Sequence, residues 1–161
     1  MIAGTISKGN AENLSDDIKY NRPEKVERQL SKWVTQAKNE NLDKILISSE
    51  AMVHQLARKD GIELLLKACD NAGITNVQAM GFFRDLVDHA ISTYKHRAKT
   101  GKHPDFEYWL RNEYETPNVL KDLFELQSSY NINWTFRKFR KNAAFMTKAF
   151  FCEWLDIKVP E

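Results

Sequence analysis

Apolar residues between positions 21 and 41 recur at the spacing of one face of an α-helix. Asn21 is a residue type that caps helix N-termini, and Pro23 suits the first helical turn. The residues on this face are Val26, Leu30, Trp33, Val34 and Ala37. We therefore predict a long amphipathic helix that ends near Asn41.

Similar periodicity, with proline or glycine at the boundaries, predicts further helices along the chain. Gly73 and Gly101 are expected to end two of them, and acidic first turns and basic last turns complement the helix dipole. The predicted ranges are 11–18, 51–58, 60–72, 85–100, 104–114, 117–130 and 143–155.

Short apolar runs rich in branched and aromatic residues predict strands between these helices. They are "KILISS" (44–49), "TNVQAMGFF" (75–83) and "INWTFRKF" (132–139). Strands that alternate with helices favour crossover connections and a parallel sheet, so the predicted class is α/β with helices flanking the sheet. Because a covered parallel sheet normally has more strands, we expect one to be missing at the N-terminal end.

The length of 161 residues predicts a single domain, 1–161, in which residues 1–22 are poorly defined. Hydrophobic residues make up 42% and charged residues 29%, and no apolar run reaches the length of a membrane span. The N-terminus lacks the pattern of a secretory signal, so a cytoplasmic protein is expected. Cys69 and Cys152 lie in apolar segments and are predicted to be small buried hydrophobes. The four histidines show no metal-ligand spacing, so no metal is predicted.

A local basic cluster, "FRKFRKN" (136–142), stands out against a net charge of only +2. It is interpreted either as a solvated surface or as a nucleic-acid contact. In the second case Arg137, Lys138, Arg140 and Lys141 would contact phosphates, with Trp134 and Phe139 behind them.

Arg84 follows the predicted strand 75–83 directly, and ligands of open α/β sheets bind beyond the carboxyl ends of strands. Ser92 lies eight residues later, about 80° around the helix and about 12 Å along it. A phosphate could accept hydrogen bonds from the Arg84 guanidinium and the Ser92 hydroxyl together. Alternatively, Arg84 pairs with Asp85 or Asp88, and Ser92 is only a small residue at a helix contact.

Ser48, Ser49 and Glu50 occupy the equivalent place after the predicted strand 44–49. The two serines could donate hydrogen bonds to an anion, and Glu50 could act as a general base if an acceptor hydroxyl approaches it. The alternative is structural: a serine caps the next helix and Glu50 complements that helix's dipole.

The segment "FFRDLVDHAISTYKHRAKTGK" resembles the 3′-phosphate-binding segment of sulfotransferases that use 3′-phosphoadenosine-5′-phosphosulfate (PAPS). Arg84, Asp88, Ser92 and Tyr94 match that family's residues in order. Three other segments are similar to segments of bacterial sulfotransferase-like proteins, and the resemblance extends over roughly residues 42–161 in consistent order. These segments are "ILISSEAM" (45–52), "DFEYWLRN" (105–112) and "WTFRKFRKNAAFMTKAFFCEWLDIKVPE" (134–161).

The resemblance implies a three-layer, P-loop-like sulfotransferase fold, incomplete at its N-terminus. It implies that Arg84 and Ser92 bind the cofactor's 3′-phosphate, in PAPS or in 3′-phosphoadenosine 5′-phosphate. It also makes Glu50 the candidate for deprotonating a hydroxyl or amine acceptor. The reaction would be sulfuryl transfer to that acceptor.

The chain departs from this family at its N-terminus. Family members open with a strand and a "P-K-[ST]-G-[ST]-[ST]" loop that holds the 5′-phosphosulfate. The segment "GTISKGN" (4–10) has similar residue types in a different order. Sulfuryl transfer is therefore expected only if another segment or polypeptide supplies the loop. The alternative function is a non-catalytic binding or assembly module, and an exposed sheet edge could promote self-association.

Overall fold

The computed structural model describes residues 11–99 and 105–156, which form two compact units. The first unit extends to Val77 and also contains Asn118–Asn131. The second contains Gln78–Pro117 and the chain from Ile132 onward. The predicted helix stop at Gly101 and the segment 4–10 lie outside the described residues. Each unit is described below by itself.

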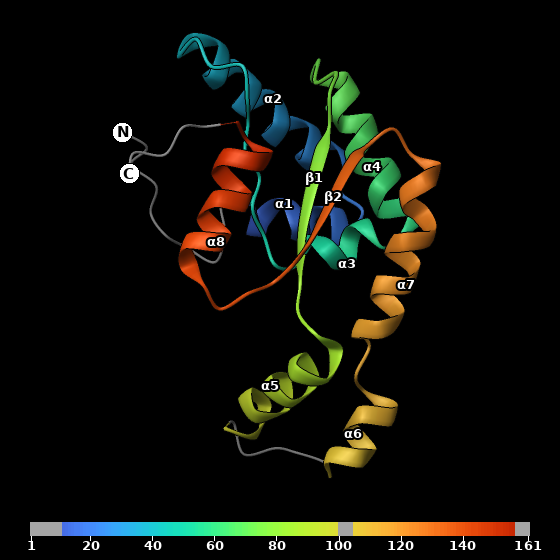
Figure 1. Ribbon diagram of the computed structural model, residues 1–161. Helices are drawn as coiled ribbons and strands as arrows, with labels where there is room; N and C mark the ends of the chain where they lie inside the picture. Colours follow the sequence, from blue (N-terminus) through green and yellow to red (C-terminus); the bar gives the residue numbers. More distant parts are fainter. Residues whose placement is uncertain (1–10, 100–104, 157–161) are drawn as a thin grey trace. The chain divides into compact units, whose positions relative to one another are not determined.

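The first unit is helical (Figure 1). It contains α1 (Glu12–Lys19), α2 (Pro23–Asn39), α3 (Met52–Leu56), α4 (Lys59–Asn71) and most of α7 (Thr116–Leu126), followed by a 3-10 turn at Gln127–Ser129. The helix predicted from residue 21 is confirmed as α2, with Pro23 in its first turn. Asn21 is not its cap, because Asn21 adopts a left-handed conformation (φ 50°) and Arg22 precedes the helix without a side-chain cap.

The apolar face of α2 lies in the core of this unit. Val26 and Leu30 are completely buried, together with Leu14 and Ile18 of α1. Leu65 of α4 belongs to the same cluster. Each fully buried aliphatic side chain of this size contributes roughly 1.5–3 kcal/mol to folding. Aliphatic packing between helices therefore holds the first unit together.

Two positions near the ends of α4 require glycine, one because of its backbone conformation and one because a neighbouring backbone lies close to it. Gly73 has φ 78°, and its N–H donates to Asp70 O (2.9 Å) while Ile74 N–H donates to Cys69 O (2.8 Å). This is the hydrogen-bond pattern of a Schellman motif, which confirms Gly73 as the helix stop. At the other end, a Cβ on Gly61 would collide with the backbone carbonyl of Gln55. Gly61 thus permits α3 and α4 to approach closely.

The prediction of a strand at 44–49 is wrong: the segment is extended but is not a strand. Ile45 and Ile47 are half-buried while Leu46 is 39% exposed, and Ile47 packs against the helical core. Such alternation arises wherever an extended segment lies on an apolar surface, and a strand additionally needs a place in a sheet. In the described residues the sheet consists of β1 and β2.

The second unit contains that sheet together with four helical elements in its described residues. Its elements are β1 (Gln78–Phe83), α5 (Leu86–Ala98), α6 (Phe106–Asn112), β2 (Asn133–Lys138), α8 (Ala143–Thr147) and a π-helical segment, Lys148–Trp154. The last two replace the single helix predicted at 143–155. Cys152 in the π-helical segment is exposed, contrary to the prediction that it is buried.

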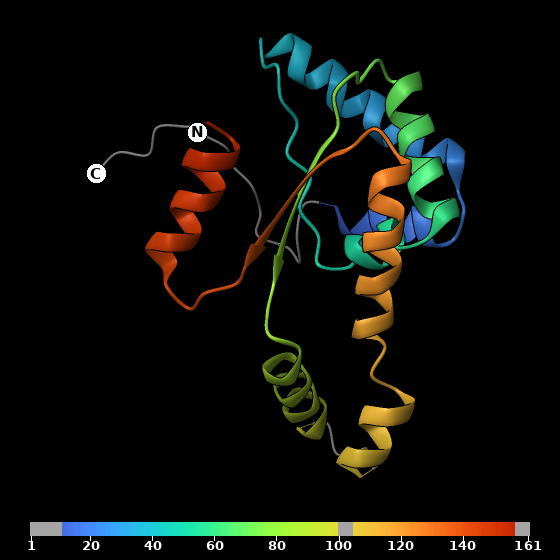
Figure 2. The same cartoon turned by 45° about the vertical axis from the view of Figure 1, so that its right-hand side comes forward.

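The strands β1 and β2 pair in parallel, from Gln78 opposite Asn133 to Phe83 opposite Lys138. Figures 1 and 2 show them side by side, with α5 following β1. The predicted strands at 75–83 and 132–139 and their parallel pairing are confirmed, and the structure is a mostly helical α/β one. Within the described residues, β1 is shorter than the predicted strand 75–83, because it begins at Gln78. The preceding residue, Val77, packs against the core of the first unit.

An aromatic cluster joins α5 to α6 in the second unit. Trp109 is 1% exposed, and its ring lies 5.4 Å from Tyr94, 6.1 Å from Phe106 and 5.2 Å from Tyr114, between ring centroids. Both helices begin at an aspartate cap: Asp85 accepts from two backbone amides of α5, and Asp105 does the same for α6. Among the described helices, none is long and apolar enough to cross a membrane.

Candidate functional site

Arg84 lies at the carboxyl end of β1, between the last strand residue, Phe83, and the cap of α5, Asp85. The sequence forces a change of backbone direction here, because Asp85 caps the helix in an extended conformation (ψ 134°). Arg84 is exposed, so its guanidinium is accessible to a ligand. This is the position that was predicted for it.

The Arg84 guanidinium contacts Ser92, as the eight-residue spacing predicted. Its Nη1 lies 3.5 Å from Ser92 Oγ, which is at the outer limit of a hydrogen bond. The guanidinium also lies over the Phe139 ring, 4.7 Å from the ring centroid. Among the ion pairs of the described residues, none joins Arg84 to Asp85 or Asp88. The alternative interpretation of Arg84 as a residue paired in the first helical turn is therefore wrong.

An open pocket of about 320 Å³ lies beside Arg84, at the carboxyl ends of both strands. Three of its lining residues are basic, one is acidic and two are aromatic. They are Arg84, Arg137, Lys138, Asp85, Phe83 and Phe136. The strands β1 and β2 are parallel, and Phe83 pairs with Lys138. The basic residues at the two strand ends therefore lie at the same edge of the sheet. The formal charge of this lining is three cations and one anion, or +2.

The sequence identified Arg84 and the 136–142 cluster as separate features, and the structure brings Arg137 and Lys138 to the same pocket as Arg84. The signal that could have joined them is the parallel pairing itself, since carboxyl ends of parallel strands meet at one sheet edge. Arg140 lies elsewhere, over the Phe145 ring at 4.5 Å from its centroid.

The N-terminus of α5 is already occupied by Asp85. Its Oδ1 accepts from Val87 N at 2.9 Å and from Asp88 N at 3.3 Å. Those amides would otherwise be available to an anion. An anion at this site must therefore be bound through side chains.

His89, one turn into α5, is a titratable group whose pKa is shifted in part by Arg84. Its Nδ1 lies 2.9 Å from Tyr114 Oη, and Tyr114 Oη donates to Leu86 O at 3.2 Å. Partial burial lowers the pKa of His89, and the positive charge of Arg84 lowers it further. Burial also raises the pKa of Tyr114. Near neutral pH, His89 is thus a neutral neighbour of the basic pocket.

Ser48, Ser49 and Glu50 belong to the first unit, whereas Arg84 and Ser92 belong to the second. Ser48 and Glu50 are exposed and Ser49 is half-buried, and Glu50 lies in the turn before α3. The structural interpretation of a serine cap is wrong, because Ala51 precedes α3 and no side chain caps that helix. The roles of Glu50 as a general base and of the two serines as anion donors stay predictions.

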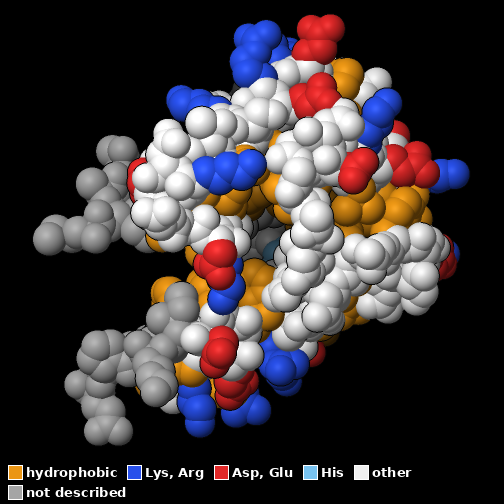
Figure 3. Space-filling view, turned by 90° about the horizontal axis from the view of Figure 1, so that it is seen from above, with side chains coloured by type: hydrophobic (Ala, Val, Ile, Leu, Met, Phe, Trp, Pro, Cys, Tyr) orange, Lys and Arg blue, Asp and Glu red, His pale blue; other side chains and the backbone are white. Residues whose placement is uncertain are grey.

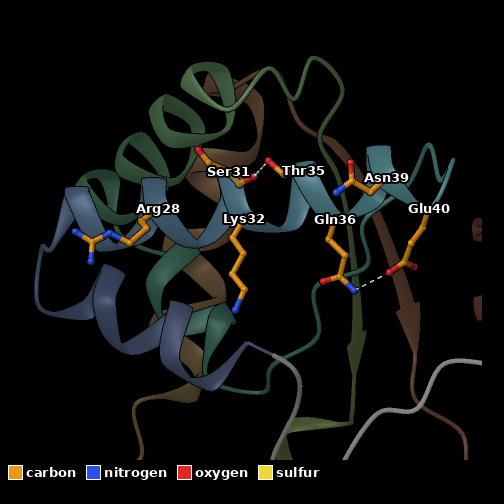
Figure 4. Close-up of a pocket in the computed structure, with 7 residues that line it drawn as sticks. All are labelled: Arg28, Ser31, Lys32, Thr35, Gln36, Asn39 and Glu40. Carbon is orange, nitrogen blue, oxygen red and sulfur yellow. Dashed lines mark hydrogen bonds between the residues drawn. The ribbon is translucent and has the colours of Figure 1, made fainter.

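The first unit also has a pocket, of about 520 Å³, but its lining residues all come from α2 and from Glu40, which follows that helix directly. Figure 4 shows Lys32, Gln36 and Glu40 extending from the same side of that helix. Gln36 donates to Glu40 at 2.9 Å, and Ser31 O accepts from Thr35 Oγ1 at 2.9 Å. Two of these side chains therefore already have a partner along the helix, and this surface, formed by one short stretch of chain, is a weaker candidate than the basic pocket.

Charged side chains of both signs are interspersed over the face seen in Figure 3, with hydrophobic side chains between them. The role of Arg137, Lys138, Arg140 and Lys141 as nucleic-acid contacts stays a prediction. In the described part of the chain, no cluster of three or more His, Cys, Asp or Glu residues could hold a metal ion.

Comparisons of the chain with protein-family models, with curated proteins and with solved structures found no match.

Proposed function

We propose that this protein binds an adenine nucleotide that carries a 3′-phosphate, and that it does so as a sulfotransferase-like domain whose cofactor is PAPS. The 3′-phosphate would occupy the pocket at the carboxyl ends of β1 and β2. Arg84 and Ser92 would contact it directly, and Arg137 and Lys138 would add positive charge. The three-layer arrangement of the sulfotransferase fold is part of this proposal.

The observation that carries the proposal is the contact of Arg84 with Ser92 in the absence of an ion pair to Asp85 or Asp88. A guanidinium held beside a hydroxyl presents several donors, and in the described part of the chain no carboxylate forms an ion pair with it. Phosphate oxygens are the acceptors that this arrangement suits best.

Charge also favours a phosphate monoester over a singly charged anion. A phosphate monoester carries about −1.5 to −2 charges near neutral pH, which complements the +2 lining of the pocket. A phosphodiester or a sulfate ester carries one charge fewer and would leave part of the lining uncompensated. This supports a terminal 3′-phosphate as the bound group.

The transfer itself would take place at the other end of the cofactor. The acceptor oxygen or nitrogen forms a bond to sulfur and the sulfur–oxygen bond to the 5′-phosphate breaks. The leaving oxygen takes the electron pair, and a base takes the acceptor's proton. Glu50 is the proposed base, and a loop supplied by another segment or polypeptide would hold the 5′-phosphosulfate. Where that loop is not supplied, the same site would make the protein a nucleotide-binding module.

Calorimetric titration with adenosine 3′,5′-bisphosphate tests the binding claim. We expect binding that weakens by about ten- to a hundredfold in Arg84→Ala, because a hydrogen bond to a charged group contributes about 1.5–3 kcal/mol. Adenosine 5′-monophosphate, which lacks the 3′-phosphate, should bind as weakly to the wild-type protein as the bisphosphate does to the variant.

Arg22→Ala is the matched control. Arg22 is also exposed and also lies over an aromatic ring, but it pairs with Asp17 at 3.2 Å in the first unit. Its removal should leave nucleotide affinity unchanged. Equal affinity of wild-type protein for both nucleotides, or equal losses in the two arginine variants, would refute the proposed function. Binding with no transfer of labelled sulfate from PAPS by this chain alone is the result expected of a nucleotide-binding module, and also of a domain whose 5′-phosphosulfate loop has not been supplied.

A further inference from the structure

The contacts of Arg84 single out Phe139, to which the sequence gives a place only behind the basic cluster of the nucleic-acid alternative. Phe139 follows β2 directly, and its backbone N–H donates to Phe83 O at 2.7 Å. That bond continues the parallel ladder beyond the pair of Phe83 with Lys138 and fixes the backbone of Phe139 beside the end of β1. The ring is half-buried.

The guanidinium of Arg84 lies over the Phe139 ring, with its Cζ atom 4.7 Å from the ring centroid. The Nη1 atom of the same guanidinium lies 3.5 Å from Ser92 Oγ. A ring face attracts a cation through its quadrupole but carries no net charge. It therefore restrains the guanidinium and leaves the positive charge available.

This distinguishes Arg84 from the arginines of the described residues that are held by carboxylates. Arg97, for example, pairs with Glu113 at 3.0 Å, and Arg111 pairs with Glu107 at 2.7 Å. A phosphate approaching such an arginine must compete with the bound carboxylate. Among the ion pairs of the described residues, none gives a phosphate approaching Arg84 such a competitor. Less side-chain freedom is also lost on binding, because the ring already restrains the guanidinium.

We propose that Phe139 is a positioning residue that holds the Arg84 guanidinium over the pocket for an incoming phosphate dianion. The proposal deepens the proposed function and rests on it for its ligand. It predicts that the aromatic ring at position 139, rather than its bulk, determines nucleotide affinity.

The binding experiment compares Phe139→Leu with Phe139→Tyr in titrations with adenosine 3′,5′-bisphosphate. Loss of the ring in Phe139→Leu should weaken binding about three- to tenfold, and Phe139→Tyr should restore it, because a cation over an aromatic face contributes in this range. In an Arg84→Ala background, Phe139→Leu should have no further effect. The proposal would be overturned if Phe139→Leu bound the nucleotide as tightly as the wild type. It would also be overturned if Phe139→Tyr bound it as weakly as Phe139→Leu.

Phe145→Leu is the matched control, because Phe145 is also half-buried and holds Arg140 at 4.5 Å. It removes a ring from beneath a different arginine of the same unit. Nucleotide affinity should not change. A loss equal to that of Phe139→Leu would show that any ring removal disturbs this unit, and the specific role of Phe139 would be contradicted.

A nuclear magnetic resonance measurement without nucleotide separates this proposal from the proposed function. The ring current of Phe139 should shift the Arg84 side-chain Nε–H resonance, and Phe139→Leu should abolish that shift while Phe145→Leu does not. If the wild-type protein fails to bind the nucleotide, the proposed function falls, and the Arg84 resonance still decides whether Phe139 positions it. An Arg84 resonance that is the same in wild type and Phe139→Leu would refute the positioning role.

Discussion

The two units of this protein bury different kinds of side chain. The first is built on completely buried aliphatic residues, such as Leu14, Ile18 and Leu30, at the contacts of helices. Among the described residues of the second, Trp109 is the large side chain that is fully buried, and the aromatic residues of its small sheet are half-buried. The basic pocket lies in the second unit.

This difference in buried side chains separates the part of the chain that contributes most to stability from the part that presents groups to a ligand. A well-packed aliphatic core contributes folding free energy but offers few groups to a ligand. A half-exposed sheet with basic and aromatic residues at its strand ends contributes less to stability and presents donors to solvent. We expect substitutions in the first unit to act mainly on unfolding, and substitutions around Arg84 to act mainly on binding.

The largest expected effect is on stability and comes from Leu30→Ala. Leu30 is completely buried, and removing such a side chain from a core costs about 2–5 kcal/mol in the free energy of unfolding. Leu110→Ala in the second unit is the comparison, because Leu110 is 39% exposed. It should cost less than about 1 kcal/mol in urea unfolding. Similar costs for both would remove the contrast between the units.

A second contrast lies between the two cysteines. Burial raises the pKa of Cys69, in the first unit, to about 11, and Cys69 is only 5% exposed. Cys152, in the second unit, is exposed. Because the thiolate is the reactive form, iodoacetamide at pH 8 should modify Cys152 in the folded protein and reach Cys69 only after unfolding. Mass spectrometry of the modified peptides measures this directly, and early labelling of Cys69 would show that the first unit opens readily.

The smallest expected effect is on pH dependence and concerns His89. Its pKa is lowered from 6.5 in the folded state, by burial first and by Arg84 second, so the unfolded chain takes up the proton more readily. The contribution of His89 to stability is therefore fully present above about pH 6.5 and is lost as pH falls through its lowered folded pKa. His89→Gln should flatten the pH dependence of the melting temperature below pH 6.5. An unchanged slope in that variant would show that His89 is not the group responsible.

Local patterns predicted much of the fold. The apolar face of α2, the stop of α4 at Gly73 and the strands that became β1 and β2 were all found, because each depends on side-chain periodicity or on one backbone conformation. The position of Arg84 beside Ser92 was also predictable, since both lie within one short strand-to-helix segment.

Features that depend on distant partners could not be predicted. The segment 44–49 has the composition of a strand, but strand formation depends on a neighbouring strand rather than on the segment itself. Arg137, Lys138 and Phe139 join Arg84 only through the register of β1 with β2, which no local pattern encodes. Asn21 has the chemistry of a helix cap, yet its left-handed backbone excludes that role.

The most direct test of the central claim is a titration of isotope-labelled protein with adenosine 3′,5′-bisphosphate, followed by backbone amide chemical shifts. Both units have a pocket, so the map of shifted amides distinguishes them. The account predicts that the largest shifts fall on residues 83–92 and 136–139, and that the α2 pocket at residues 28–40 is unaffected. Shifts centred on α2, or no shifts at saturating nucleotide, would contradict it.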